Sequence, residues 1–292
     1  MTRPRPTLRD LAELVRAPAG LTVPGDTLSG AAAAGWPLGP RSAFLPVASL
    51  ALYWAGMSLN DYADRRLDAA ERPERPIPSG RVAPRQALAL ASVLTVAGVA
   101  VAGAAGGRRA LRVALPLAGV VWSYDLVLKD TPAGPVAMAA ARCLDVLLGA
   151  SGATRAAALP ATAMAVHTLG VTALSRGEVH GTSPAVATVA ATGTVLAATV
   201  AATPPRPVRR SPARPFTWLL AGTFAGQVAR AQAAAAFRPD AQTVRRATGV
   251  GIRGMLPLQA ALTARTGAVR TAAALLGMGP LVRAASKVVS PT

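Results

Sequence analysis

The sequence is short of charged residues, aromatic residues and cysteine, and each shortage narrows the class of protein. Only 15% of the 292 residues are charged, whereas about a quarter are charged in a soluble domain. Aromatic residues make up 4% and hydrophobic residues 52%, so Ala, Val and Leu supply most of the apolar surface. The single cysteine, Cys143, forms no intrachain disulfide, and with two histidines it is too little for a Cys/His metal centre.

Acidic residues are also scarce. The chain has 13 Asp and Glu against 31 Lys and Arg, a formal net charge of +18. Such a charge raises nucleic acid as a partner. The basic residues are almost all Arg and lie mostly between apolar segments, where membrane proteins place charged loops. Because no basic patch with interleaved aromatic residues occurs, we expect no nucleic-acid partner. The first twenty residues lack an isolated apolar core, so no signal peptide is expected.

The chain is rich in apolar segments that approach membrane-spanning length. They predict an all-α polytopic integral membrane bundle formed by one domain over residues 1–292. A soluble Ala-rich bundle is the alternative, but it needs helices with polar faces, and segment 87–107 has none. A weaker stretch at 244–262 is predicted to be either a short interfacial helix or the ninth span. We expect about nine spans, at roughly 18–35, 43–60, 87–107, 111–127, 133–153, 156–175, 184–203, 215–237 and 264–286.

The distribution of Arg and Lys predicts the orientation in the cell membrane. Residues 1–16 form a basic segment, and most loop Arg and Lys residues fall on the same side as this segment, which the positive-inside rule assigns to the cytoplasm. The four Arg residues within Pro204–Pro215 argue against this orientation. With the N-terminus inside, the loops that begin near Asn60, Asp125 and Ser175 all emerge on the cytoplasmic side, where their polar residues can face a common cavity.

One stretch concentrates the acidic residues. Asp61, Asp64 and Asp68 are spaced three and four residues apart, and at ~100° per residue they fall within about 60° on one helical face. Two interpretations are open. The acids can be solvated and paired with neighbouring Arg residues, or they can bind Mg²⁺ that bridges to a diphosphate leaving group.

The residues around this cluster resemble a known family. NDYADRRLD, residues 60–68, matches the NDxxDxxxD motif of the UbiA superfamily of intramembrane prenyltransferases, and RPERPIPSGRV is similar to the loop that follows it there. The resemblance implies transfer of an isoprenyl group from its diphosphate to a lipophilic or aromatic acceptor, with Mg²⁺ as the cofactor. It implies that Asp61, Asp64 and Asp68 are catalytic metal ligands and that Asn60 orients them.

Other positions fit the family less closely. Tyr124 and Lys129 in YDLVLKD resemble a tyrosine and a lysine after the fourth span, one residue further apart than in the commoner form. The resemblance implies that Lys129 is catalytic through contact with diphosphate. ARCLDVLLGA, with Arg142 and Asp145, is similar to a fifth-span pattern. The further substrate-binding residues that we predict are Arg16, Arg75, Tyr124 and Arg142.

The second acidic motif of the family is depleted here. At its place the chain has LSRGEVHGTSP, in which Ser175, Glu178 and Thr182 would align with the three aspartates and only Glu178 is anionic. We predict a catalytic role for Glu178, and His180 is either a substrate-binding residue or structural. This form resembles the EboC-like branch, whose members are linked to secondary metabolism. The alternative function is a non-catalytic membrane protein that binds or translocates a lipophilic metabolite.

His167 lies inside the sixth predicted span. A lone intramembrane histidine indicates either function or a hydrogen bond between helices, and we favour the hydrogen bond. The sequence contains no phosphate-binding GxxxxGK[ST] loop, no HExxH or CxxC metal motif and no GxSxG elbow. Other catalytic classes therefore have no support in the residues.

Overall fold

The computed structural model describes residues 6–37, 39–203, 205 and 213–288. Within these ranges the regular structure is helical and no strand occurs, so the predicted all-α class is confirmed. Part of two predicted features lies outside the described residues. These are Arg3 and Arg5 of the basic N-terminal segment, and Arg206, Arg209 and Arg210 of the Pro-rich loop.

The helices follow one another with short connections. In chain order they are α1 (Leu8–Leu14), α2 (Ala17–Gly20), α3 (Pro24–Ala33), η1 (Pro40–Phe44), α4 (Leu45–Glu71), α5 (Pro84–Ser123), η2 (Tyr124–Leu128), α6 (Gly134–Gly149), α7 (Thr154–Ser175), α8 (Pro184–Ala202), α9 (Arg214–Phe237), α10 (Ala241–Ala264) and α11 (Val269–Val288).

The sequence explains where many of these helices begin. Proline occupies the first turn of α3, α4, α5, α6, α8 and α9, where its missing N–H removes no helical hydrogen bond. Ser183 and Asp240 cap α8 and α10, and each side chain accepts a backbone N–H two or three positions into the helix. Local sequence therefore sets these boundaries.

The observed helices differ from the span predicted at 18–35, which is divided between the short helices α2 and α3. The spans predicted at 87–107 and 111–127 are two helices that pack side by side within the stretch labelled α5. The backbone leaves helical geometry between them at Gly107, with φ 60° and ψ −151°, and Trp122 donates a hydrogen bond of 3.0 Å to Thr95 across the pair. The weaker stretch at 244–262 is part of α10, a helix of 24 residues that packs against α3, α7 and α9. Among the described residues, four helical stretches are long and apolar enough to cross a membrane: Pro40–Glu71, Pro84–Leu128, Thr154–Ser175 and Pro184–Ala202.

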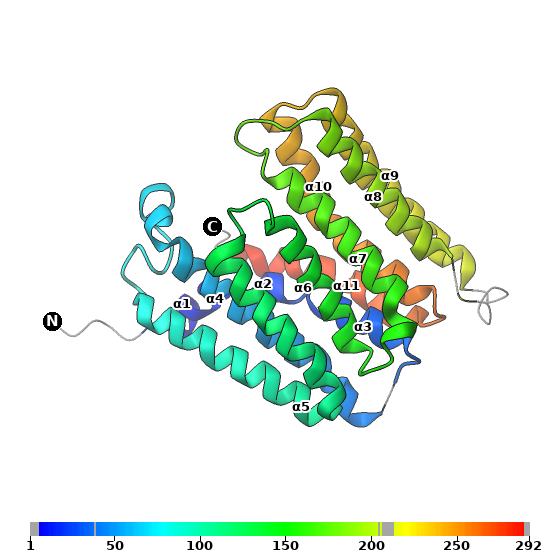
Figure 1. Cartoon of the computed structure of the whole chain (residues 1–292), viewed down its shortest axis with the longest axis horizontal. Helices are drawn as coiled ribbons and strands as arrows, with labels where there is room; N and C mark the ends of the chain where they lie inside the picture. Colours follow the sequence, from blue (N-terminus) through cyan, green and yellow to red (C-terminus); the bar gives the residue numbers. More distant parts are fainter. Residues whose placement is uncertain (1–5, 38, 204, 206–212, 289–292) are drawn as a thin grey trace.

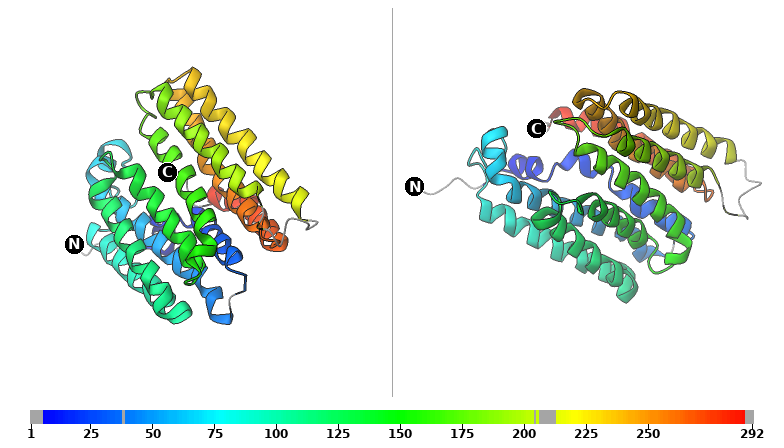
Figure 2. Two further views of the ribbon diagram at one scale, coloured as in Figure 1. Left: turned by 45° about the vertical axis from the view of Figure 1, so that its right-hand side comes forward. Right: turned by 45° about the horizontal axis from the view of Figure 1, so that its top comes forward.

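The helices form a bundle in which chain neighbours pack side by side (Figure 1). Helices α4 and α5 make one flank, and α8 and α9 make the opposite flank, while α3, α6, α7 and α10 lie between them (Figures 1 and 2). Most fully buried core residues are Ala, Leu and Val. Small side chains let the helix axes approach closely, as in other membrane bundles.

Two glycines bring α3 and α6 into backbone contact. A Cβ atom on Gly30 would overlap the backbone of Val146, and one on Gly149 would overlap the backbone of Thr27. Because this contact leaves no room for side chains, polar groups one or two turns away on the two helices are held close to each other. Asp26 and Arg142 are such groups.

Several loops meet at one end of the bundle, which we call the acidic end because it carries residues 60–81. Lys129, which follows η2, pairs with Asp64 of α4. Arg176, after α7, donates a hydrogen bond to the carbonyl of Thr131, and Thr182 donates its N–H to the carbonyl of Pro239. The loops near Asn60, Asp125 and Ser175 therefore share one end of the bundle, as the sequence predicts.

Candidate active site

The acidic cluster lies on the last turns of α4 and is compensated by basic side chains. The Asp61 carboxylate is 3.1 Å from Arg16 and 3.6 Å from Arg75, and Asp64 pairs with Lys129. Asp61 is only 4% exposed. Buried carboxylates at a membrane boundary require such partners, because an unpaired charge loses its hydration without compensation.

Arg75 is the centre of this charge network. Arg75 is 6% exposed, and its guanidinium lies 2.8 Å from the Asp68 carboxylate and 3.6 Å from that of Asp61. Asp68 is 1% exposed and its second neighbour, Arg72, is 3.7 Å away. Arg75 therefore ties the loop after α4 to the helix itself.

Arg16 reaches the cluster from the turn between α1 and α2. Its backbone adopts the left-handed conformation, with φ 48° and ψ 52°, a conformation that is uncommon outside glycine and asparagine. This conformation redirects the chain from α1 into α2, and the Arg16 guanidinium contacts Asp61. The structure places Arg16 at the site that the sequence predicts for it.

Lys129 reaches the cluster through a π-helical turn. Residues 124–128 form η2, and the N–H of Lys129 donates to the carbonyl of Tyr124, five residues earlier, over 2.9 Å. This turn accommodates the extra residue that separates Tyr124 from Lys129 relative to the commoner family spacing. Single π turns inside helices often accompany functional sites. Tyr124 itself is half-buried at the start of the turn.

Asp125 belongs to this site, although the sequence analysis names it only as the start of a loop on the same side and assigns it no role. It is buried, and its Oδ1 accepts a hydrogen bond of 3.2 Å from the Asn60 side chain. The two residues are 65 positions apart, so no local spacing reveals their contact. The available signals were its position directly after the predicted Tyr124 and its place on the same side of the membrane as Asn60.

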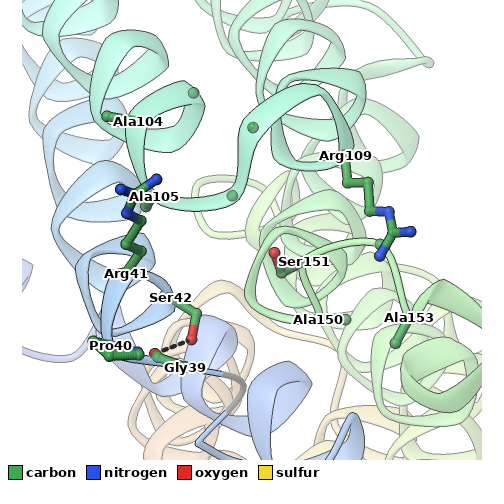
Figure 3. A pocket seen from close by; sticks show the side chains of 14 residues that line it. Gly39, Pro40, Arg41, Ser42, Ala104, Ala105, Arg109, Ala150, Ser151 and Ala153 are labelled. Carbon is green, nitrogen blue, oxygen red and sulfur yellow. Dashed lines mark hydrogen bonds between the residues drawn. The ribbon is translucent and has the colours of Figure 1, made fainter.

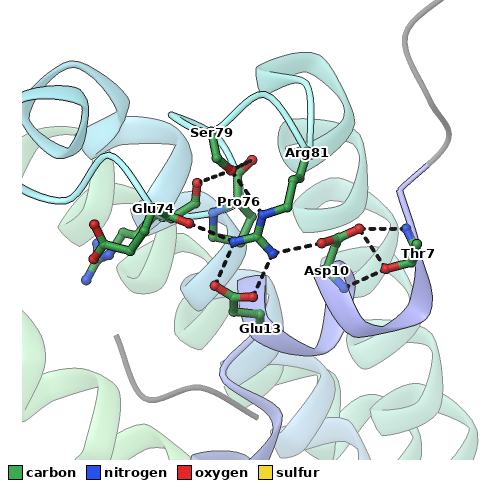
Figure 4. Close-up of polar contacts among 8 residues, drawn as sticks. Thr7, Asp10, Glu13, Glu74, Pro76, Ser79 and Arg81 are labelled. Carbon is green, nitrogen blue, oxygen red and sulfur yellow. Dashed lines mark hydrogen bonds and ion pairs between the residues drawn. The ribbon is translucent and has the colours of Figure 1, made fainter.

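The loop after α4 is also clamped to α1 (Figure 4). The Arg81 guanidinium donates hydrogen bonds to both Glu13 oxygens, to Asp10 and to the Glu74 carbonyl, at 2.7–2.9 Å. Hydrogen bonds from Thr7, followed by the nearby Arg81, lower the pKa of Asp10 from 3.8 to about 2. Hydrogen bonding to Glu13 raises the pKa of Arg81. The clamp thus fixes both segments that deliver Arg16 and Arg75.

The second predicted motif lies beside this site but makes few contacts. Glu178 is half-buried and His180 is exposed, and in the described part of the chain neither side chain forms an ion pair or hydrogen bond. Ser175 donates its hydroxyl to the carbonyl of Thr172. The structure brings this loop to the acidic end through Arg176, whereas the roles of Glu178 and His180 stay predictions.

A second polar cluster lies inside the bundle. Asp26 of α3 is fully buried, 3.0 Å from Nε of Arg142 on α6, and accepts a hydrogen bond of 2.8 Å from Gln259 of α10. One turn along α6, Asp145 accepts a hydrogen bond of 2.7 Å from Ser49 of α4. We call these five residues the buried polar cluster. Sequence analysis identified Arg142 as a substrate-binding residue but did not identify its partners Asp26 and Gln259.

His167 forms the predicted hydrogen bond between helices. One ring nitrogen lies 3.0 Å from the Gly251 carbonyl of α10, and the other is 3.4 Å from the Thr194 hydroxyl of α8. The ring also packs edge-on against Phe224, with centroids 5.0 Å apart. The structural interpretation of His167 is therefore confirmed.

A hollow of about 1020 Å³ opens at the opposite end of the bundle (Figure 3). It lies where η1, the bend in α5 and the turn between α6 and α7 meet, and its lining includes Arg41, Arg109 and Ser151 but no acidic residue. None of the predicted site residues lines it. The hollow therefore belongs to a different part of the molecule from the acidic cluster.

The carboxylate oxygens of the acidic cluster are suitable ligands for a magnesium ion that is also bound by substrate. Mg²⁺ takes oxygen ligands and is commonly held by one or two carboxylates together with substrate phosphates. Asp61 and Asp64 supply such oxygens, and Asn60 and Asp125 lie beside them. No group of three or more His, Cys, Asp and Glu side chains within the described ranges is arranged to hold a metal alone. An ion at this site would therefore need ligands from a bound substrate.

Comparisons with known proteins place the chain in a family. The UbiA prenyltransferase family matches residues 23–180, more than half of the chain. Digeranylgeranylglyceryl phosphate synthase of Methanothrix thermoacetophila is 42% identical over 92 residues, which are 31% of this chain and 34% of that protein. The synthase of Halobacterium salinarum is 38% identical over 136 residues, 46% of this chain and 49% of that protein. The chain thus matches a third to a half of the length of these relatives.

Solved structures share the fold over a larger part of the chain. A digeranylgeranylglyceryl phosphate synthase structure has a TM-score of 0.68 at 17% identity and covers 90% of this chain and 99% of that one. A UbiA homologue from Archaeoglobus fulgidus, bound to DMAPP and Mg²⁺, has a TM-score of 0.57 at 14% identity and covers 82% and 98% of the two chains.

The fold and the site define a polytopic helical membrane protein with a paired acidic cluster at one end of its bundle. The chain belongs to the UbiA prenyltransferase family.

Proposed function

We propose that the protein is a membrane-embedded, Mg²⁺-dependent prenyltransferase that moves an isoprenyl group from its diphosphate to a lipophilic or aromatic acceptor in secondary metabolism. Residues 1–292 form one transmembrane domain in this proposal, with the acidic end in the cytoplasm. The observation that carries it is the convergence of Arg16, Arg75 and Lys129 on Asp61, Asp64 and Asp68. The Archaeoglobus fulgidus homologue, whose structures contain Mg²⁺ with DMAPP or GPP, supports it.

Each residue has a defined task in the reaction. Asp61, Asp64 and Asp68 would hold Mg²⁺, which neutralises charge on the diphosphate, while Asn60 orients the carboxylates through its contact with Asp125. Lys129 and Arg16 would turn from the carboxylates to the diphosphate and stabilise it as the carbon–oxygen bond breaks. The acceptor forms the new bond to the isoprenyl carbon, diphosphate leaves, and the acceptor loses a proton.

The remaining predicted residues surround this centre. Arg75 holds Asp61 and Asp68 in place through its ion pairs, and Tyr124 and Arg142 contact the substrates. Glu178 and His180 act on the acceptor side of the site. The small apolar side chains of the central helices enclose the isoprenyl tail and keep water away from an allylic cation.

The acidic cluster can be tested by diphosphate binding and release. Purified protein in nanodiscs is incubated with radiolabelled GPP and Mg²⁺, and bound ligand and released diphosphate are counted. Asp64→Asn should weaken Mg²⁺-dependent binding at least ~10-fold, because a charge-assisted contact contributes about 1.5–3 kcal/mol. Asp130→Asn is the matched control, since Asp130 is an exposed carboxylate one residue after Lys129. A wild-type protein without Mg²⁺-dependent binding would refute the proposal.

The second candidate function is a non-catalytic protein that binds or translocates a lipophilic metabolite. The depleted second motif favours it, because Glu178 is the only carboxylate among Ser175, Glu178 and Thr182. Wild-type protein that binds GPP but releases no diphosphate with any acceptor would support this function over catalysis.

A further inference from the structure

The buried polar cluster contains hydrogen-bond acceptors that the protein does not satisfy. Oδ1 of Asp145 and Oε1 of Gln259 are buried and have no hydrogen-bond partner. The residues are 6% and 1% exposed. A buried acceptor without a donor destabilises a protein, because the group has lost its hydration without compensation. Two such acceptors in one cluster therefore require an explanation.

Two other buried atoms of the cluster, Asp26 Oδ2 and Arg142 Nε, also lack a hydrogen bond, but they form an ion pair with each other at 3.0 Å. Asp26 takes both the Arg142 guanidinium and the Gln259 amide, and Ser49 donates to the second oxygen of Asp145. With two carboxylates and one guanidinium, the cluster has no excess positive charge to attract an anion. The missing partner must therefore be a donor, such as a hydroxyl group.

The cluster is connected to the acidic site along α4. Ser49, Tyr53, Asn60 and Asp64 fall within about 60° on one face of this helix, and Ser49 is about 16 Å from Asn60 along the axis. Tyr53 is half-buried between them. Arg142 is also half-buried and lies one turn of α6 closer to the acidic end than Asp145, with Met255 3.7 Å from its guanidinium. A polar stripe thus leads from the predicted diphosphate site into the bundle.

We propose that the buried polar cluster binds the polar group of the prenyl acceptor and selects an uncharged acceptor that carries a hydroxyl group. This inference rests on the proposed prenyl transfer. The hydroxyl donates to Asp145 Oδ1 or Gln259 Oε1, and Asp145 disfavours an acceptor with a carboxylate or phosphate at this position. The cluster therefore determines the chemical class of the acceptor, whereas the acidic end binds the diphosphate.

Equilibrium binding without diphosphate or Mg²⁺ tests the cluster by itself. Tritiated hexadecan-1-ol is bound to the purified full-length protein, and unlabelled hexadecan-1-ol, 1-methoxyhexadecane and hexadecanoate compete for the site. We expect the ether and the acid to compete at least about tenfold more weakly than the alcohol, because neither offers the cluster a hydroxyl donor at neutral pH. This series uses wild-type protein and does not depend on any variant folding.

Two substitutions assign the preference to the cluster. Asp145→Asn places an amide donor where the unsatisfied oxygen lies, so the preference for alcohol over ether should fall about tenfold or reverse. Gln259→Met should weaken alcohol binding, whereas Gln232→Met should preserve it. Gln232 is the matched control because it is a fully buried glutamine outside the cluster. Its side-chain oxygen accepts a hydrogen bond from the Thr194 hydroxyl.

The outcomes separate this inference from the proposed function. Equal competition by alcohol, ether and acid would overturn the inference and would mean that water satisfies the two acceptors. Selective alcohol binding without release of diphosphate from any prenyl donor would refute prenyl transfer but leave the hydroxyl selectivity standing.

Discussion

At the scale of residues, the acidic site compensates several buried carboxylates with few cations. Arg75 contacts both Asp61 and Asp68, so one guanidinium compensates two nearly inaccessible charges. Arg72 contacts Asp68 from a half-exposed position, where solvent screens the interaction. The sequence places both arginines in the loop after α4, but only the structure separates their contributions.

Replacement of Arg75 should therefore destabilise the protein far more than replacement of Arg72. Arg75→Gln leaves two buried carboxylates undercompensated, which typically destabilises by about 3–5 kcal/mol. Arg72→Gln should change the free energy of unfolding by about 0–1 kcal/mol. Thermal unfolding in detergent measures both, and adding Asp68→Asn to Arg75→Gln should recover part of the loss. Equal unfolding temperatures for the two single variants would contradict the charge network.

At the scale of elements, two departures from regular helical geometry shape the bundle, one at the acidic end and one beside the hollow. The π turn of η2 brings Lys129 back to α4 despite its longer spacing from Tyr124. The break at Gly107 turns the chain back, so that the two helices of α5 pack against each other. The sequence places this break between the predicted spans 87–107 and 111–127, whereas the π turn does not follow from helical periodicity.

Gly107 and Gly119 provide a matched test of the bend in α5. Gly107 has φ 60° and ψ −151°, a conformation that an L side chain strains. Gly107→Ala should destabilise by about 1–3 kcal/mol, whereas Gly119→Ala should be neutral or stabilise by about 0.5–1 kcal/mol. A Cβ atom at Gly119 meets nothing within 4 Å. Chemical unfolding in mixed micelles compares the two, and a harmless Gly107→Ala would exclude strain at the bend.

The clamp between α1 and the loop after α4 should be sensitive to acid. Because the folded-state pKa of Asp10 is lowered to about 2, its stabilising contribution is fully present above ~4 and is lost as pH falls toward 2. Spin labels at Leu8→Cys and Ala70→Cys, with Cys143→Ala, report the distance between the segments. The distance distribution should broaden between pH 4 and 2. Asp10→Asn should broaden it at neutral pH also; unchanged distributions in both experiments would argue against the clamp.

At the scale of the whole molecule, the two ends of the bundle differ in chemistry. The acidic cluster and its paired cations occupy one end, and the arginine-lined hollow occupies the other. The proposed orientation puts the acidic end in the cytoplasm, where prenyl diphosphates would be supplied. It therefore predicts that residues beside the hollow, and not those near the acidic cluster, are accessible from outside an intact cell.

Cysteine labelling in intact cells tests this orientation. In a Cys143→Ala background, Ala153→Cys lies beside the hollow and Ala69→Cys lies near the acidic cluster, and both positions are exposed. A membrane-impermeant maleimide should label Ala153→Cys in intact cells and Ala69→Cys only after permeabilisation. The reverse pattern would show that the arginines of residues 206–214 outweigh those of the N-terminal segment.

The fold class and the acidic motif could both be predicted from the amino-acid sequence. Long apolar runs can bury their backbone polar groups in a bilayer only as helices, and the spacing of Asp61, Asp64 and Asp68 places them together on any helix. These are properties of single segments, so local chemistry is sufficient to predict them.

Which charged groups contact each other depends on how the helices pack. The contacts of Asn60 with Asp125, Arg81 with Glu13, and Arg142 with Asp26 join residues 65, 68 and 116 positions apart. Helix packing creates them, through features such as the glycine contact between α3 and α6, and no sequence periodicity encodes such distances. The buried polar cluster is therefore a product of the fold, although each of its residues is visible in the sequence.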